Sequence, residues 1–333
     1  MDSDIQLEFF KAVKTKIPEH LSAADEIGKI LGISPDSAYR RMRSEKPVTL
    51  DELHKLCTHY KISVDQVMNI QTDAFLFFGK MVNPKNFSFN EYLRSMMENM
   101  VFMQNFKSKE LYYLAKDIPF FHLFQVRELA AFKYYFWMKT LLHFPEFANK
   151  KFSLDEYPEE TFQLGTKNLQ LYNQLNSFEL WNFETLNSTL HQIEFYHDAG
   201  MFVTDLDAVR IYDALYKFLD LLEQQAELGY KFSIDDPAKK PMGSFKMYFN
   251  EVVTLDNSIL AVLDGSKISF QTHSIFNFML TRDLRFTEYV HENIQTLMRK
   301  STYISSVSEK ERLRFFNRMR EKIHRRREAV QPD

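Results

Sequence analysis

The sequence predicts a mainly α-helical protein, with a compact helical bundle at its N-terminus and a larger helical region that contains one small antiparallel β meander. Three observations support this fold class. The 333-residue chain has 32 Phe and 16 Tyr but only 8 Gly, which suits packed helices better than turn-rich β structure. Apolar residues recur at helical spacing through most of the chain. Alternating or β-branched segments, separated by turn residues, are confined to the stretch from Phe245 to His273.

Length and composition limit the number of domains and the classes of protein that this chain can belong to. A chain of this length usually forms two or three domains, and 45% hydrophobic residues are enough to bury a sizeable core. The net charge of −3 excludes a uniformly basic protein that coats nucleic acid, although it allows a local basic patch. Cys57 is the only cysteine, so an intramolecular disulfide and a zinc site built from cysteines are both excluded.

No membrane span or leader is expected from the sequence. The N-terminus lacks a basic stretch followed by an apolar one, which argues against a signal peptide. The most apolar stretch begins at Pro119, but it contains Arg127, Glu128, Lys133 and Lys139, and such charges are costly at the centre of a bilayer. We therefore expect a buried core helix there and a cytoplasmic protein.

Apolar spacing and capping residues predict the first two helices. Ile5, Phe9 and Val13 recur every four residues and form one apolar stripe, which ends at Pro18. Ser22 begins a second helix, which stops at Gly32. The residues expected to face inward from this second helix are Ile27, Ile30 and Leu31.

Three further short helices are predicted before residue 70. The third has Ser34 as its N-cap and Pro35 at its first helical position. Thr49 and Glu52 form a capping box that opens a fourth. Its expected inward residues are Leu50, Leu53 and Leu56. A second capping box predicts a short fifth helix over Ser63–Met68.

The sequence divides into four parts. Residues 1–70 form the helical bundle, and residues 71–87 read as a linker. Residues 88–235 contain a run of helical patterns. Residues 236–330 contain the β meander, with turns predicted at Asp256–Asn257 and Asp264–Gly265, and then the C-terminal helices.

Gly32, Ile33 and Ser34 join the second and third predicted helices through a three-residue turn. Two helices joined by a short turn with glycine form the helix-turn-helix arrangement. The segments AADEIGKILGISPDSAYRRM and VTLDELHKLCTHYKIS resemble the DNA-binding domain of phage-repressor and Cro-type transcriptional regulators. The resemblance implies a helix-turn-helix domain over residues 1–70 that binds double-stranded DNA. Two positions depart from it, since many members carry alanine at Gly28 and a β-branched residue at Arg41.

The rotation of the third helix predicts which of its residues meet DNA. At roughly 100° per residue, Ala38 and Met42 face the domain core. Ser37, Arg40 and Arg43 then point outward into the major groove, where arginine can pair with guanine O6 and N7. Tyr39, Arg41 and Lys46 lie on the flanks, where phosphates are within reach. The predicted DNA-binding residues are thus Ser37, Tyr39, Arg40, Arg41, Arg43 and Lys46.

Several alternatives are open for the basic helix and for the rest of the chain. A basic cluster on a short helix is usually a solvated face, and a helix-turn-helix-like module can bind a partner protein, which would make this chain an adaptor. An enzyme in the C-terminal region would need a cleft with converging polar groups. The sequence has no glycine-rich phosphate loop and no G-x-S-x-G or H-E-x-x-H motif, so we expect neither an enzyme nor a cofactor.

Two polar clusters admit more than one interpretation. His191, Glu194 and Asp198 share one face of a predicted helix at a spacing that metal ligands use, but we favour a solvated polar face and expect no metal. The last helix ends in Arg325–Arg327. We favour a docked amphipathic helix with a solvated basic face, while a second phosphate contact and an acidic partner surface are alternatives.

The large C-terminal region suggests a role in assembly or sensing. Taken whole, the chain looks like uncharacterised bacterial regulators in which a repressor-type domain precedes a larger helical region. One recognition helix covers only a few base pairs, so we expect a homodimer formed through the C-terminal region. Its aromatic residues are most simply core, although they could line a pocket for a small-molecule effector.

Overall fold

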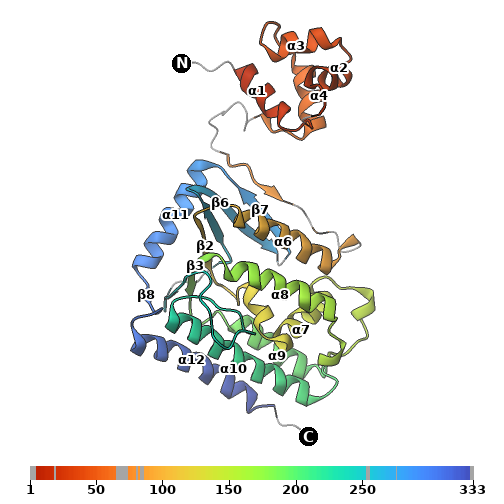
Figure 1. Ribbon diagram of the computed structural model, residues 1–333. Coiled ribbons are helices and arrows are strands. Elements are labelled where there is room, and N and C mark those ends of the chain that lie inside the picture. The colour runs from red at the N-terminus through yellow and green to blue at the C-terminus, as the bar shows by residue number, and fades with distance from the viewer. Residues whose placement is uncertain are drawn as a thin grey trace. The chain divides into compact units, whose positions relative to one another are not determined.

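Figure 1 shows the computed structural model of the chain, which describes residues 5–18, 20–64, 74–79, 82, 86–252, 256–274 and 276–330. The chain divides between Leu76 and Phe77 into two compact units, the N-terminal unit and the C-terminal unit. Each unit has its own buried apolar core. Four of the six residues of the predicted fifth helix at Ser63–Met68 lie outside the described residues, as do residues 71–73, 80, 81 and 83–85 of the predicted linker at 71–87.

The N-terminal unit contains the four helices that the capping residues predict. They are α1 (Ile5–Lys14), α2 (Ala23–Leu31), α3 (Pro35–Met42) and α4 (Leu50–Tyr60). Ser22 and Ser34 each accept a hydrogen bond from a backbone amide in the first turn of the helix that follows. Thr49 and Glu52 form the predicted capping box at the start of α4.

Two of the three leucines that were expected to face inward from α4 do so. Leu56 is fully buried and Leu53 packs against the same core, but Leu50 is 83% exposed. A step of three residues turns a helix by roughly 300°, so Leu50 lies about 120° around α4 from Leu56. The predicted inward position of Leu50 is therefore wrong. The buried residues of this core are Phe9, Phe10, Val13, Ile17, Ile27, Leu31, Ala38, Met42 and Leu56.

The C-terminal unit is built on a large mixed β-sheet, which overturns the expectation of a mainly α protein with a small meander. The described residues form a sheet of eight strands in the order β1-β7-β6-β5-β2-β3-β4-β8. The strands are β1 (Phe78–Gly79), β2 (Lys109–Leu114), β3 (Asn176–Trp181), β4 (Phe245–Phe249), β5 (Ile259–Leu263), β6 (Ser266–Ser274), β7 (Asn277–Thr281) and β8 (Thr302–Tyr303). The central strands β2, β3 and β4 run parallel, and the other pairs are antiparallel.

The predicted meander is only partly present. Asp264 and Gly265 both have positive φ, as expected for the two-residue turn that joins β5 to β6. However, β4 does not pair with β5, because β2 and β3 lie between them. The hairpin expected around Asp256–Asn257 is therefore wrong.

Helices cover both faces of the sheet, and α11 lies apart from the others in Figure 1. They are α6 (Phe89–Gln104), α7 (Arg127–Phe136), α8 (Glu159–Asn173), α9 (Asn187–Asp198), α10 (Asp205–Leu228), α11 (Leu284–Arg299) and α12 (Glu309–Arg327). On β2, Leu111 and Tyr113 join the core beneath α7, α8 and α10. Tyr112 and Leu114 pack with Ile294 and Met298 of α11 on the other face. Among the described residues, no helix combines the length and the hydropathy that crossing a membrane requires.

The basic C-terminal helix is docked, as predicted, but ion pairs engage part of the basic face that was expected to be solvated. Arg320 of α12 bonds to Asp220 and Glu223 of α10, and Arg327 contacts Asp213 of the same helix at 2.7 Å. The predicted apolar stripe of α12 is buried beneath them. Acidic groups of the same chain therefore engage part of its positive charge.

Polar side chains are buried at the centre of the C-terminal unit. The Glu179 carboxylate on β3 accepts hydrogen bonds from Tyr172 and, at 2.8 Å, from Trp181 Nε1. Lys231 is also fully buried, and its Nζ donates to the Tyr172 carbonyl oxygen at 3.0 Å and to Ser177 Oγ at 2.9 Å. Burial lowers the pKa of Lys231 to about 7, against an opposing effect of Glu179.

The buried lysine predicts a stability that rises with pH. Between pH 7 and 10.5 the unfolded chain holds a proton that folded Lys231 does not hold, so the free energy of unfolding should increase by up to roughly 1.4 kcal/mol per pH unit. Urea denaturation at pH 7 and pH 9, followed by tryptophan fluorescence, measures this slope. Lys231→Met should flatten it, and the exposed control Lys240→Met should not. Equal slopes in all three proteins would contradict the assignment.

Candidate nucleic-acid interface

The turn between α2 and α3 has the geometry that its glycines predict. Gly32 adopts a left-handed conformation with φ +69°, and its amide closes α2 on the Gly28 carbonyl oxygen. A Cβ atom at Gly28 would lie 2.9 Å from the Ile33 carbonyl oxygen. Alanine, which the resemblance implies at this position, would therefore crowd the turn. Glycine lets the backbone of the turn approach α2 closely.

Helix α3 exposes part of the predicted basic surface. Ala38 and Met42 are buried as expected, while Tyr39, Arg40 and Arg43 are exposed. The Arg43 guanidinium lies 5.7 Å from the centre of the Tyr39 ring. Lys46 is exposed in the segment after α3, and Ser37 is half-buried. Of the six predicted site residues, only Arg41 lies inside the unit.

Arg41 is buried rather than placed on the flank of α3. Arg41 is only 5% exposed. Arg41 Nε donates to Glu52 Oε2 at 2.9 Å, and Nη2 donates to Glu52 Oε1 at 2.6 Å. Its Nη1 donates to the Ser37 carbonyl oxygen at 3.1 Å. The expected phosphate contact is inconsistent with this position, because the guanidinium instead ties α3 to the start of α4.

Gln6 on α1 fixes the segment that follows α3, a role that sequence reasoning missed. Its Nε2 donates to the carbonyl oxygens of Arg41 and Lys46 at 2.7 and 2.8 Å. Its Oε1 accepts a hydrogen bond from the Val48 amide at 3.0 Å. A glutamine on an amphipathic helix usually reads as a solvated residue. Its partners lie more than 30 residues away in the sequence, so no local pattern could identify it.

An acidic residue moderates the charge of this surface. Glu45 Oε1 lies 3.2 Å from Arg43 Nε, and Glu45 Oε2 lies 4.0 Å from Arg40 Nε. All three side chains are largely exposed, and such surface pairs contribute about 0–1 kcal/mol. A phosphate or a guanine can therefore replace Glu45 at little cost. The surface therefore carries the positive charges of Arg40 and Arg43 together with the negative charge of Glu45.

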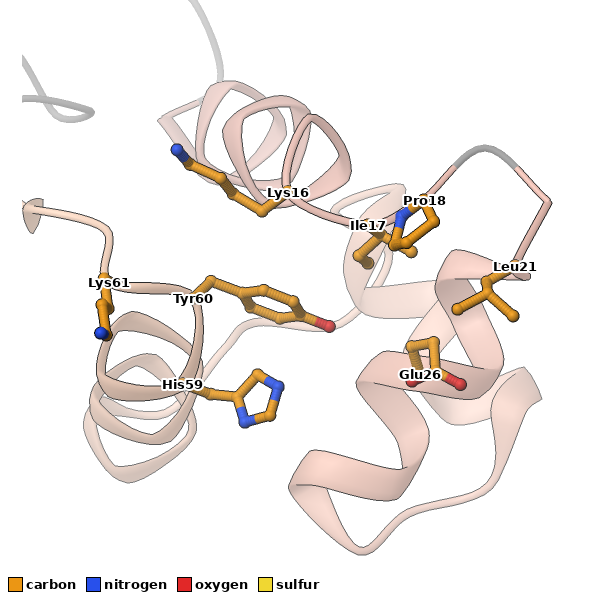
Figure 2. Close-up of a pocket in the computed structure, with 8 residues that line it drawn as sticks. All are labelled: Lys16, Ile17, Pro18, Leu21, Glu26, His59, Tyr60 and Lys61. Carbon is orange, nitrogen blue, oxygen red and sulfur yellow. The ribbon is translucent and has the colours of Figure 1, made fainter. Parts of the chain in front are cut away.

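A hollow of about 370 Å³ lies elsewhere on the N-terminal unit, as Figure 2 shows. Its residues come from the chain that follows α1, from α2 and the segment before it, and from the end of α4. They are Lys16, Ile17, Pro18, Leu21, Glu26, His59, Tyr60 and Lys61. The Tyr60 ring reaches into the hollow from the end of α4. None of the lining residues belongs to α3, so this hollow is separate from the predicted DNA-binding residues.

The polar cluster on α9 serves the docking of α12. Glu194 Oε1 lies 2.7 Å from Arg326 Nε, and His191 Nε2 lies 3.3 Å from Arg326 Nη2. Within the described part of the chain, no three His, Cys, Asp or Glu side chains are arranged to hold a metal ion. The face is therefore not simply solvated, because two of its three polar residues contact another helix.

The ion pair between Arg41 and Glu52 predicts a stability that is lost in acid. Hydrogen bonds from Arg41 lower the pKa of Glu52 below its ordinary 4.5, so the stabilisation is present above that pH and disappears as pH falls through the folded-state pKa. Glu52→Gln keeps a capping side chain but removes the charge, and should cost about 2 kcal/mol at pH 7. Thermal unfolding followed by circular dichroism measures this, with Glu8→Gln as an exposed control. Equal loss in both variants would refute the role of the pair.

The comparisons with known proteins agree with the N-terminal geometry. Residues 11–82 match the family model described as the BetR domain, a helix-turn-helix-like DNA-binding domain of transcriptional regulators. No curated protein and no solved structure matches the chain. The N-terminal part of this chain is thus similar to a DNA-binding domain of transcriptional regulators.

Proposed function

We propose that this protein is a transcriptional regulator that binds double-stranded DNA in a sequence-specific way through α3. The observation that carries the proposal is a short helix with exposed arginines, held rigidly by Arg41, Glu52 and Gln6. The match of residues 11–82 to the BetR domain supports it. Pre-organised side chains lose less entropy on binding, which favours recognition of one sequence over others.

The exposed residues of α3 and of the segment that follows it divide into two roles in this proposal. Arg40 and Arg43, with Ser37 at the edge, face base edges in the major groove. Tyr39 and Lys46 contact phosphates, which set the position of the protein on the duplex. Arg41 has no direct contact with DNA, and it acts by holding α3.

One alternative function has an observation in its favour. The hollow beside α4 has apolar walls at Ile17, Pro18 and Leu21, and Leu50 is exposed elsewhere on the same unit. Such features suit a partner protein, which would make the chain an adaptor. The hollow and α3 use different residues, so substitutions can separate the two functions.

The proposal includes a homodimer formed through the C-terminal unit. Within one chain, α7 is largely buried in the core and α12 is docked on α10, so the proposed dimer uses another surface. Apolar residues remain exposed where β1 pairs with β7 and on α11, and we call this set the β7–α11 patch. It consists of Phe78, Met279, Leu284 and Tyr289. The rings of Phe77 and Phe286, 5.0 Å apart, bring β1 next to the start of α11.

Substitutions on α3 should separate base recognition from phosphate binding. Against duplexes selected from a random pool, Arg40→Ala should lower affinity by about 1–3 kcal/mol and relax the preference at one or two positions. Lys46→Ala should weaken every duplex alike and reduce the salt slope by about one. Fluorescence anisotropy over a salt series measures both effects.

Leu21→Glu, in the wall of the hollow, is the control for these substitutions and should bind DNA as the wild type does. Wild-type protein that binds none of the duplexes would favour the adaptor. Wild-type protein that binds all duplexes equally would refute sequence-specific recognition.

Dimerisation should depend on the β7–α11 patch. Leu284 and Tyr289 are 70% and 63% exposed, so Leu284→Glu and Tyr289→Glu should leave the fold intact and make the full-length protein monomeric in sedimentation at micromolar concentration. A fragment of residues 1–76, which has its own core, should also be monomeric and bind DNA more weakly than the full chain. The exposed control Val203→Glu should remain dimeric. A monomeric wild type would refute the dimer.

A further inference from the structure

We propose that the hollow on the N-terminal unit binds a partner protein through a segment in which acidic residues stand next to large apolar ones. The hollow has a volume of about 370 Å³, and ligand sites in proteins typically occupy roughly 300–1,000 Å³. None of its lining residues is among the predicted DNA-binding residues. The proposal names the chemistry of a partner for this hollow, and it holds whether or not α3 binds DNA.

One end of the hollow is positively charged. In Figure 2 the amino groups of Lys16 and Lys61 lie on the opposite side of the hollow from Leu21. Both lysines are exposed, and neither forms an ion pair with another described residue. The carboxylate in the lining belongs to Glu26, whose Oε1 is engaged by Lys29 Nζ at 2.6 Å. The charge that is left unpaired in the lining is therefore positive, and it favours an acidic ligand.

The other end of the hollow is apolar. Figure 2 shows Pro18 and Leu21 on the side away from the two amino groups. Leu21 is 41% exposed and Pro18 is also exposed, while Ile17 belongs to the buried core of the unit. The Leu21 amide donates to the Pro18 carbonyl oxygen at 2.9 Å, which holds these two residues in one turn. A large apolar side chain next to an acidic one would leave water at this end.

The wall between the two ends is held in place by the fold. Tyr60 is half-buried at the end of α4 and packs against the core of the N-terminal unit. Its ring meets the ring of His59 edge to face, with 4.8 Å between their centres. Lys61 ends α4 in a left-handed conformation, and its amide donates to the Cys57 carbonyl oxygen. The backbone around this wall is therefore fixed before a partner arrives, which lowers the entropic cost of binding.

The openness of the hollow favours a segment of a protein over a free small molecule. Five of the eight lining residues are exposed, namely Lys16, Pro18, Leu21, His59 and Lys61. A small-molecule site usually buries most of the surface of its ligand, whereas an open hollow lets a peptide chain continue on both sides. A nucleic-acid backbone fits less well, because its charged phosphates would meet an apolar end and the Glu26 carboxylate.

Fluorescence anisotropy with the full-length protein, in the absence of DNA, tests the proposal. The probes are two fluorescein-labelled peptides, Gly-Asp-Glu-Leu-Phe-Gly and Gly-Phe-Leu-Glu-Asp-Gly, which present the two kinds of side chain in either order. We expect at least one of them to bind at one site per chain, with a Kd that rises with salt concentration. The versions with Asn-Gln in place of the two acidic residues should bind about tenfold more weakly, since both lysines lose a charged partner.

Substitutions in the hollow test its two ends separately. Lys16→Gln and Lys61→Gln should each raise the Kd about two- to fivefold, as expected for an exposed ion pair. Lys55→Gln is their matched control, because Lys55 is an exposed lysine of α4 that does not line the hollow. Leu21→Glu should raise the Kd at least about tenfold, since it removes apolar contact and repels the acidic peptide. Leu50→Glu, at an exposed leucine outside the hollow, should leave the Kd unchanged.

Wild-type protein that binds neither acidic peptide, or that binds the Asn-Gln versions equally well, would overturn the proposal. Three other results would replace the partner protein with a different occupant. A DNA affinity that falls in Lys16→Gln and Lys61→Gln but not in Lys55→Gln would assign the lysines to nucleic acid. A dimer that becomes monomeric in sedimentation on Leu21→Glu would place a second copy of the chain in the hollow. Sodium glutarate that displaces the peptide as effectively as unlabelled peptide does would indicate a small-molecule site.

Discussion

The ion pair between Arg41 and Glu52 is the interaction on which the geometry of the basic surface depends. Helix α3 has eight residues, and isolated helices of fewer than about 12 residues are marginal in water. Its stability must therefore come from contacts with the rest of the unit. Glu52 binds the guanidinium with both oxygens and also accepts from the Thr49 amide, so one carboxylate joins the end of α3 to the start of α4. The positions of the exposed Arg40 and Arg43 therefore depend on the buried Arg41.

A second buried carboxylate organises the C-terminal unit. Glu179 lies on β3, a central strand with neighbours on both sides. It accepts hydrogen bonds from His122 of the 3-10 helix η2 (Phe120–Gln125) and Tyr172 of α8, and from Trp181 on its own strand. A buried charge without partners would be strongly destabilising, so its three donors hold these elements together.

Local sequence signals predicted the parts of the fold that depend on local geometry. Ser22, Ser34 and the Thr49–Glu52 box set helix starts, and Asp264–Gly265 set a hairpin, because each acts on residues a few positions away. Of the three central strands, β4 lies in the stretch that was predicted to form strands, whereas β3 was not predicted, because side chains on both of its faces are buried. Residues 111–114 of β2 are likewise apolar at every position, and such a run lacks the alternation that identifies a strand.

The candidate site shows the same division. The inward turn of Ala38 and Met42 follows from helix periodicity, and the exposure of Arg40 and Arg43 follows with it. The position of Arg41 does not, because its partner lies on another helix, and an arginine is normally assigned to the surface unless a carboxylate is known to meet it.

The contacts of Gln6, Arg41 and Glu52 that hold α3 also provide a way to recognise other proteins whose recognition helix is held by the same kind of contacts. Gln6 and Arg41 are separated by 35 residues, and Arg41 and Glu52 by 11. The pair with Glu52 requires arginine at position 41, since Lys lacks the planar fork that meets both carboxylate oxygens. A sequence with Gln, Arg and Glu at these intervals, around a Gly-containing turn, would mark a recognition helix whose orientation is fixed before DNA arrives. A sequence with the exposed arginines but without this Gln, Arg and Glu would mark a recognition helix whose orientation is not fixed in advance.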